Sequence, residues 1–457
     1  MFILAEATDP KTWNKEDLLA KDRRYMWHHM SQYNPNPLIV TGGKGSWITD
    51  VDGNRYFDGM AGIWCTNIGY GREELAEAAY EQLKSLAFFP LTQSHVPGIE
   101  LSKKVSEWLG EEYRIFFSNS GSEANEVAFK IARQYHHHRG QSNRYKVISR
   151  YRAYHGNSMG ALAATGQSIR KLTYEPLAPG FLHVQPPYCY RCSFGKTYGS
   201  CNLECAQAFD EVINWEGEET VAEVIMEPAI TGGGVIVPPP EYLPKVREIC
   251  DKHGVLLHVD EVICGFGRSG RKFGHQNFGI KPDIVTMAKG ITSGYLPLSA
   301  TAVRAEIADA FMGADTNQHF RHINTFGGNP VSCNLALKNM DIMEEEKLIE
   351  RAEQLGLELR QKLSAIEDHP NVGDIRSFGF IAGIELVEDR QTKEPAAPAK
   401  VVKVISECKQ RGLIIGKNGD TIPGFNNILT LAPPFSTTSA DIDFIVRVLE
   451  EALATVL

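Results

Sequence analysis

Short apolar runs alternate with helix-like segments through the middle of the chain, and this alternation constrains the fold more than any other feature. Apolar runs that are too short for helices and are separated by helical segments are typical of β-α-β units in a parallel sheet. We therefore expect an α/β fold whose large domain has a mostly parallel central sheet. The runs lie at residues 115–117, 146–149, 221–226, 255–259 and 283–287.

The two ends of the chain follow a different pattern, and 457 residues are enough for at least two domains. Near the N-terminus, Asp52-Gly53-Asn54 separates two alternating runs and predicts a tight hairpin turn. Beyond residue 330, strands and helices alternate irregularly, as in an α+β arrangement. We predict a large domain over residues 70–330 and a smaller α+β domain that combines residues 1–69 with residues 331–457.

Composition and charge exclude several classes of protein. The net charge of −9, without a long basic run, argues against nucleic acid or an anionic membrane as partner. No apolar run is long enough to cross a bilayer, and the sequence turns polar directly after Met1–Ala5, so we expect no secretion signal. Nine cysteines without such a signal indicate a reducing cytoplasm.

Residues 175–205 are expected to form an irregular insertion on the surface of the large domain. The insertion carries a C-x2-C pair followed by a C-x3-C pair, which could hold a structural zinc ion as four thiolates. The spacing is shorter than in common zinc modules, so free thiols are the favoured interpretation and no metal is expected. The four candidates are Cys189, Cys192, Cys201 and Cys205.

A small polar loop and a capped helix follow the first apolar run. Ser120 and Glu123 have the spacing of a capping box, and apolar residues recur at helical spacing behind them. The start of such a helix offers free N–H groups and the positive end of a dipole to a phosphate. An ordinary capped helix without a ligand explains the same pattern equally well.

Four further features follow other apolar runs. They are Tyr154-His155, Glu227, Asp260 and Lys289. Strand ends of a parallel sheet meet at one edge, so these side chains are expected to lie near the helix start. A phosphate cradle, an aromatic ring, a buried carboxylate and a desolvated amine are together the groups that pyridoxal phosphate requires. We therefore predict pyridoxal 5′-phosphate as cofactor.

The order and spacing of these motifs resemble class III (omega) aminotransferases of fold type I, over essentially the whole chain. The resemblance implies the pyridoxal-phosphate-dependent transferase fold and an omega-aminotransferase. Such an enzyme moves an amino group from a primary amine or omega-amino acid to a 2-oxo acid by a ping-pong mechanism. The motifs are Ser118–Ala124, Tyr154–Gly156, His258–Val262, Gly265–Gly270, Ala288–Gly290 and Thr325–Pro330.

The resemblance also implies roles for individual residues. Lys289 would form the imine and move the proton, and Asp260 would hold the pyridinium proton. Tyr154 and Val262 would cover the two faces of the ring. The remaining cofactor-binding residues that it implies are Ser120, Gly121, Ser122, His155, Glu227 and Thr325.

Two of the implied roles extend beyond the cofactor. Thr325 would reach the phosphate bound by a neighbouring subunit, which implies a homodimer, or a tetramer built from dimers. Trp64 and Tyr154 would line the substrate pocket, although core packing explains Trp64 as well.

The substrate is less well defined by the sequence. Many omega-aminotransferases carry an arginine for the substrate carboxylate where this chain has Gly416, and Lys417 is adjacent. This form resembles the taurine– or β-alanine–pyruvate branch, with pyruvate as acceptor. Because a lysine cannot hold a carboxylate bidentately, we hypothesise that Lys417 or a nearby arginine supplies the charge.

Two alternative functions remain open at this point. The same scaffold could support an aminomutase, a decarboxylase or the aminotransferase of biotin synthesis, because the residues above do not decide which substrate bond breaks. A non-catalytic metal protein built on the four cysteines is the other alternative, and it would leave Lys289 and Asp260 without a purpose.

Overall fold

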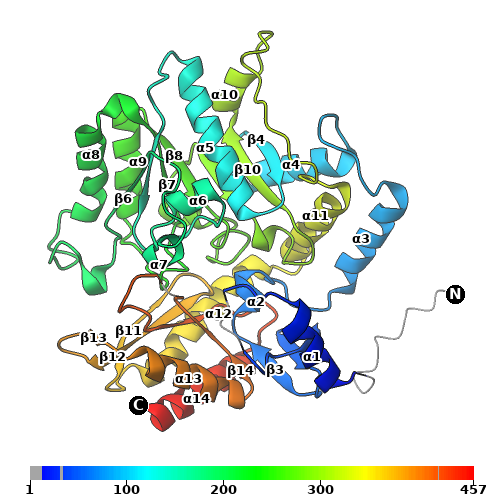
Figure 1. Cartoon of the computed structure of the whole chain (residues 1–457), viewed down its shortest axis with the longest axis vertical. Coiled ribbons are helices and arrows are strands. Elements are labelled where there is room, and N and C mark those ends of the chain that lie inside the picture. The colour runs from blue at the N-terminus through cyan, green and yellow to red at the C-terminus, as the bar shows by residue number, and fades with distance from the viewer. Residues whose placement is uncertain (1–12, 31–33, 420) are drawn as a thin grey trace.

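The computed structural model describes residues 13–30, 34–419 and 421–457 (Figure 1). The first residues, on which the expectation of no secretion signal rests, lie outside this part, as does Asp420. The described residues form sheets of seven, four and five strands. In Figure 1 the seven-stranded sheet lies in the upper half, and elements from both ends of the chain lie together below it.

The seven-stranded sheet confirms the predicted, mostly parallel central sheet. Neighbouring strands are parallel except where β10 pairs with β4 and β9. Each predicted apolar run forms one strand of it. In order across the sheet the strands are β4 (Tyr113–Ser118), β10 (Ser299–Arg304), β9 (Ile284–Met287), β8 (Leu256–Asp260), β7 (Val221–Met226), β5 (Lys146–Arg150) and β6 (Phe181–Val184).

Two strands of this seven-stranded sheet were not predicted. Strand β10 consists mostly of small residues, so it lacks the large apolar side chains that mark a buried strand. Strand β6 shows that the expectation of a wholly irregular insertion over residues 175–205 was wrong, because Val147 of β5 pairs with Phe181. It is a short edge strand in which only Val184 is fully buried, so its sequence pattern is weak.

Helix α5 (Gly121–His138) begins directly after β4 and carries the predicted capping box. Its buried face packs Val127 and Ile131 against Ile284 of β9 and Val303 of β10. This packing fixes the start of the helix at the carboxyl ends of the parallel strands. The other α-helices are α1 (Lys15–Tyr25), α2 (Ala61–Trp64), α3 (Glu73–Ser85), α4 (Val96–Leu109), α6 (Met159–Ala164), α7 (Ser168–Lys171), α8 (Glu204–Glu216), α9 (Tyr242–His253), α10 (Ala305–Ala308), α11 (Pro330–Glu345), α12 (Leu348–Lys362), α13 (Pro398–Gln410) and α14 (Ser439–Val456).

The four-stranded sheet joins the two ends of the chain. Its hairpin, β2–β3, turns at Asp52-Gly53-Asn54 as predicted. Strand β14 then pairs in parallel with β3, so that Leu413 lies opposite Phe57. Across the sheet the strands are β1 (Val40–Lys44), β2 (Trp47–Asp50), β3 (Arg55–Asp58) and β14 (Leu413–Ile414).

The five-stranded sheet comes from the C-terminal part of the chain and is antiparallel. It contains β11 (Val372–Ser377), β12 (Ala382–Asp389), β16 (Ile428–Leu431) and β15 (Gly416–Lys417), with β13 (Glu394–Pro395) paired to β12. The strands of both smaller sheets lie within the segments assigned to the smaller domain, but the predicted domain boundaries themselves stay a prediction.

The cysteines and the helices bear on two further expectations. All nine cysteines are unpaired. Cys189, Cys192, Cys201 and Cys205 lie around one small cavity, yet the described residues contain no group of three or more histidine, cysteine, aspartate or glutamate side chains placed to hold a metal ion. No helix in the described ranges is long and apolar enough to cross a membrane.

Candidate active site

A cavity of about 400 Å³ opens at the carboxyl ends of β4, β8 and β9. It brings together most of the site residues predicted from the sequence, although they come from distant parts of the chain. Those that line it are Ser120, Gly121, Ser122, Tyr154, His155, Glu227, Asp260, Val262 and Lys289.

The start of α5 forms one wall of this cavity. The Glu123 carboxylate accepts hydrogen bonds from the backbone N–H groups of Asn119 (2.7 Å) and Ser120 (3.2 Å), which completes the capping box. The N–H groups of Gly121 and Ser122 belong to the first helical turn, where no intrahelical acceptor exists. They are therefore available to an anion at the positive end of the helix dipole.

Two glycines let the chain approach closely at this wall. A Cβ on Gly121 would lie 2.9 Å from Cγ2 of Val262, and a Cβ on Gly156 would lie 2.5 Å from the Ser122 hydroxyl. Gly156 also has a φ of +145°, a conformation that other residues rarely adopt. The cradle at the helix start therefore requires glycine at both positions.

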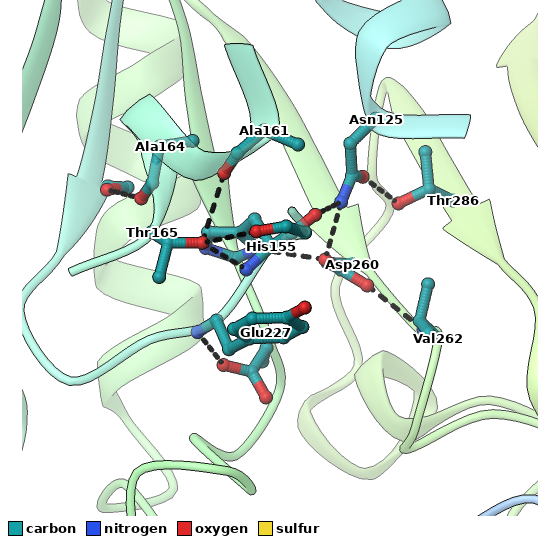
Figure 2. Close-up of polar contacts among 12 residues, drawn as sticks. Asn125, His155, Ala161, Ala164, Thr165, Glu227, Asp260, Val262 and Thr286 are labelled. Atoms are coloured by element: carbon teal, nitrogen blue, oxygen red, sulfur yellow. Dashed lines mark hydrogen bonds and ion pairs between the residues drawn. The ribbon is translucent and has the colours of Figure 1, made fainter. Parts of the chain in front are cut away.

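Asp260 is 3% exposed, and each of its carboxylate oxygens accepts a hydrogen bond (Figure 2). Oδ2 accepts from Nδ1 of His155 (2.8 Å) and from Nδ2 of Asn125 (3.0 Å), and Oδ1 accepts from the N–H of Val262 (3.0 Å). Burial alone would raise the pKa of Asp260, but the hydrogen bonds from His155 and Asn125 and the electrostatic attraction of His155 outweigh it, so the pKa is lowered. This carboxylate is built to stay ionised.

A chain of buried polar side chains supports Asp260 from within the sheet. The Thr286 hydroxyl donates to Oδ1 of Asn125 (2.7 Å), so Nε2 of His258, 2.9 Å from the same hydroxyl, must be its donor. Nδ1 of His258 lies 3.7 Å from the buried Glu223 carboxylate. These contacts fix the orientation of the Asn125 amide, whose Nδ2 then faces Asp260.

None of these supporting residues was predicted from the sequence. A signal was present, because Glu223, His258 and Thr286 are each a single polar residue inside an apolar run. The three runs are neighbouring strands, with Ile225 paired to His258 and Asp260 paired to Thr286. A polar residue in each of several buried strands indicates a hydrogen-bonded network, because an unpaired one would be costly.

Lys289 is the second residue after β9, following Ala288, and has a left-handed φ of +46°. Burial lowers the pKa of its amine, although Cys65, Asp260 and Glu227 oppose this shift. The next residue must be glycine, because a Cβ on Gly290 would lie 2.5 Å from Nδ2 of Asn67. A strained backbone and a desolvated amine are both typical of a functional lysine.

Glu227 directly follows β7 and positions Tyr154. Its carboxylate accepts from the N–H of Tyr154 (3.2 Å) and from both the N–H (3.0 Å) and the hydroxyl (2.8 Å) of Thr231. Burial raises its pKa, as it does that of Tyr154. The guanidinium of Arg170 lies 4.9 Å from the centre of the Tyr154 ring, a contact not predicted from the sequence.

Three predicted site residues do not line the cavity. Trp64 has a left-handed φ of +57° and packs in an apolar cluster with Val262, while its neighbour Cys65 does line the cavity. Thr325 is exposed, and Lys417 is half-buried in β15. Their roles stay predictions.

The packing around Gly416 leaves no room for an arginine side chain at that position. A Cβ at this residue would lie 2.6 Å from Cε of Met60 and 2.7 Å from the Thr430 hydroxyl. Met60 therefore occupies the space that a side chain would need. Arg170 is close to this segment, because a Cβ on Gly419 would lie 3.3 Å from its Nη2.

These residues fit pyridoxal phosphate. The glycine-lined helix start suits its phosphate, the ionised Asp260 suits a protonated ring nitrogen, and the desolvated Lys289 suits its aldehyde. Val262 and Tyr154 line the same cavity and offer an apolar and an aromatic surface to a flat ring.

Comparisons with known proteins agree with this site. A family model described as aminotransferase class-III matches residues 29–453. An uncharacterized aminotransferase from Bacillus subtilis is 57% identical over 442 residues, 96% of this chain and 97% of that protein. A taurine–pyruvate aminotransferase from Bilophila wadsworthia is 42% identical over 450 residues, 97% of this chain and 98% of that protein. The crystal structure of a Bacillus anthracis aminotransferase superposes with a TM-score of 0.94 at 56% identity, covering 96% of this chain and 98% of the other. The chain belongs to the class-III aminotransferase family.

Proposed function

We propose that the protein is an omega-aminotransferase that uses pyridoxal 5′-phosphate and transfers an amino group from a primary amine or omega-amino acid to pyruvate. One observation carries this proposal: the desolvated amine of Lys289 and the ionised carboxylate of Asp260 line the same cavity as a glycine-lined helix start. The similarity to taurine–pyruvate aminotransferase supports pyruvate as the acceptor.

The binding roles follow from the contacts. The first-turn N–H groups of Gly121 and Ser122 would hold the phosphate, with the Ser122 hydroxyl kept in place by Asn157 (3.0 Å from its N–H). Asp260 would accept a hydrogen bond from the protonated ring nitrogen of the cofactor. The hydrogen bond from His155 would keep the Asp260 carboxylate oriented. When bound, the cofactor supplies an electron sink for the substrate's α-carbon.

Lys289 is the group that would move the proton. Its lowered pKa leaves more of the amine neutral, so that it can accept a proton from substrate carbon and return it. Asp260 cannot take that role, because its lowered pKa and its donors keep it ionised and in place. Glu227 would act indirectly, by holding the backbone N–H of Tyr154 and thus its ring.

Substrate selectivity would depend on the charged residues near the Gly416 segment. Because Met60 occupies the space beside Gly416, no side chain at that position can bind the substrate. The substrate carboxylate or sulfonate would instead pair with Lys417 or Arg170. A single ammonium binds as a point charge, which suits both carboxylates and sulfonates. This favours the taurine and β-alanine type of donor.

A homodimer with Thr325 reaching the neighbouring phosphate is part of the proposal. Large apolar side chains next to Thr325 are exposed, among them Ile323 (69%) and Phe326 (64%), and the ring of Phe326 lies 5.9 Å from that of Phe88, itself 41% exposed. Such a patch on a globular protein indicates an interface. Light scattering would distinguish a monomer, a dimer and a tetramer.

A cytoplasmic location also belongs to the proposal. Its support is that all nine cysteines are unpaired thiols, as expected in a reducing compartment.

The test is a half-reaction followed by a donor panel. The loaded enzyme mixed with an amine alone should convert its cofactor to pyridoxamine phosphate without release of CO2. Pyruvate should then convert the pyridoxamine phosphate back to pyridoxal phosphate. Taurine, β-alanine, 4-aminobutyrate, diamines and an arylalkylamine would be compared as donors. Release of CO2, or an amino group that moves within one substrate, would instead identify a decarboxylase or an aminomutase.

A further inference from the structure

A second cavity, of about 770 Å³, lies beside the segment that follows β6. Its walls come from the two residues that follow β5, from residues 185–197, from residues 392–393 and from the loop that carries Phe425. In the described part of the chain it has no lining residue in common with the Lys289 cavity. The proposed aminotransferase reaction does not use it.

Arg152 is the central feature of this cavity. It is only 4% exposed, and its Nε donates to the carbonyl of Gly233 (3.1 Å). Its Nη2 is buried without a hydrogen-bond partner, and no carboxylate within the described ranges forms an ion pair with it. A buried guanidinium without a counter-charge is costly, and burial accordingly lowers the pKa of Arg152.

Stacking does not remove this cost. The guanidinium lies 5.0 Å from the ring centre of Tyr188 and 5.9 Å from that of Phe425, so these aromatic rings are close to it. Cation–π contacts of this kind act on the face of the guanidinium, whereas hydrogen bonds form along its N–H edge. The aromatic rings therefore do not neutralise the positive charge of Arg152.

The neighbouring charges increase the excess of positive charge. Glu385 is the buried carboxylate of this region, and it is shared by Arg191 (2.5 Å) and Arg376 (3.0 Å) and by the Tyr188 hydroxyl. Nη2 of Arg191 is also buried without a partner in the described chain. Lys393, whose Nζ donates to the carbonyl of Tyr190 (2.8 Å), adds a further cation to the lining.

We propose that this cavity binds a phosphorylated small molecule, with the phosphate held between Arg152 and Arg191. A phosphate offers several acceptor oxygens and up to two negative charges. This matches a lining that, in the described part of the chain, holds four cationic side chains and no carboxylate: Arg152, Arg191, Lys196 and Lys393. The cavity is within the usual size range of small-molecule sites and much larger than a bare phosphate needs. The rings of Tyr188 and Phe425 provide surface for the organic part.

Calorimetric titration of the loaded enzyme tests this proposal, because the cofactor then fills its own phosphate site. The probes are phenyl phosphate and inorganic phosphate, at constant ionic strength. We expect saturable binding of both, with phenyl phosphate tighter. Equal affinity would overturn the assignment to an organic ligand, and absence of saturable binding would overturn the site.

Substitutions in the cavity lining test whether the two phosphates bind there. Arg191→Gln should weaken both probes by about tenfold, as expected for loss of one charge-assisted hydrogen bond. Arg152→Lys keeps the charge but loses the forked geometry, and should weaken binding as well. Lys403→Ala, an exposed lysine of α13 outside the cavity, is the control and should change nothing. Unchanged affinity in a folded Arg191→Gln protein would contradict the proposal.

Discussion

The two cavities deal with buried charge in opposite ways. Around Lys289, the buried carboxylates of Asp260 and Glu227 each accept several hydrogen bonds. Around Arg152, the carboxylate Glu385 is shared by two guanidinium groups, and two Nη2 atoms have no acceptor among the described residues. The first cavity is therefore lined by hydrogen-bonded anions and suits a cationic group. The lining of the second contains several cations and, among the described residues, no carboxylate, which suits an anion.

The same contrast exists on a smaller scale within the first cavity. Asp260 and Glu227 are both 3% exposed, yet the pKa of Asp260 is lowered and that of Glu227 is raised. The difference lies in their hydrogen-bond donors: Asp260 has His155 and the Asn125 amide, while Glu227 has neutral backbone and hydroxyl groups. Partners, and not burial alone, decide which carboxylate stays ionised.

The largest effect is expected from Lys289→Ala. Loss of the only amine in the proposed role should abolish transamination and covalent attachment of the cofactor. Borohydride reduction followed by mass spectrometry measures the attachment, with Lys417→Ala as a matched control that keeps it. A reducible imine that survives in Lys289→Ala would show that another lysine carries the chemistry.

Asp260→Asn removes the ionised partner of the first cavity. Turnover should fall by about a hundredfold or more, because charge stabilisation at the reacting centre is lost while the fold is kept. Since the pKa of Asp260 is lowered, the carboxylate is ionised throughout the neutral range, and the loss should be the same across it. Near-normal turnover, or a loss that varies with pH near neutrality, would contradict this role.

Glu385→Gln tests the second cavity. It leaves Arg191 and Arg376 without their shared carboxylate, so the free energy of unfolding should fall by about 3–5 kcal/mol. Burial raises the pKa of Glu385, but Arg376, Tyr188 and Arg191 outweigh it and lower the pKa. The stability contributed by the ionised carboxylate is therefore present at neutral pH and lost as the pH falls through the lowered pKa.

Denaturant unfolding of both proteins at neutral and acidic pH measures this difference. The matched control is Asp374→Asn, which removes a less buried partner of Arg376 and should cost less. Equal stabilities of the Glu385→Gln protein and the native protein at neutral pH would mean that the cations are not held by this carboxylate.

Asn125→Ala should have a smaller effect, about tenfold on turnover, because Asp260 loses one of its donors but keeps His155. The pKa of Asp260 should rise, so the acid limb of the pH–rate profile should move to higher pH. Thr286→Val is the matched control: it removes the hydroxyl that orients the amide and should move the limb in the same direction by less. If the acid limb of the pH–rate profile does not move in Asn125→Ala, Asn125 does not support the ionised state of Asp260.

The smallest effect is expected near Gly416, at residues that do not line the first cavity. Lys417→Ala should raise the KM for pyruvate a few-fold and leave kcat unchanged, because a partly exposed charge pair contributes little. Arg170→Ala is the direct comparison. If neither variant changes KM, the substrate carboxylate is recognised elsewhere.

Much of the fold could be predicted because the strands that carry the site are strongly apolar. The runs ending at Asp260 and near Lys289 are buried along their length, and burial of this kind leaves a clear pattern. Strand β10 could not be predicted, since its Ala, Ser and Thr residues fit a tight place between two strands but also suit a helix or a loop.

The residues of the candidate site also divide into those that the sequence identifies and those that it does not. Residues that act through their own chemistry, such as Lys289, stand out by type and position. Residues that act through another side chain do not, because Asn125 gains its role only when folding places its amide against Asp260. Arg152 was overlooked for a related reason: its lack of a counter-charge depends on which side chains surround it, and these come from distant segments.

The pairing of β3 with β14 has a consequence for the order of events during synthesis. Phe57 leaves the ribosome early, but its partner in the sheet, Leu413, is made only when the chain is nearly complete. The hairpin of residues 47–58 must therefore wait with one edge open while the central sheet is already assembling. A nascent chain that stops before residue 413 would expose that edge, and we expect it to depend on a chaperone or to aggregate.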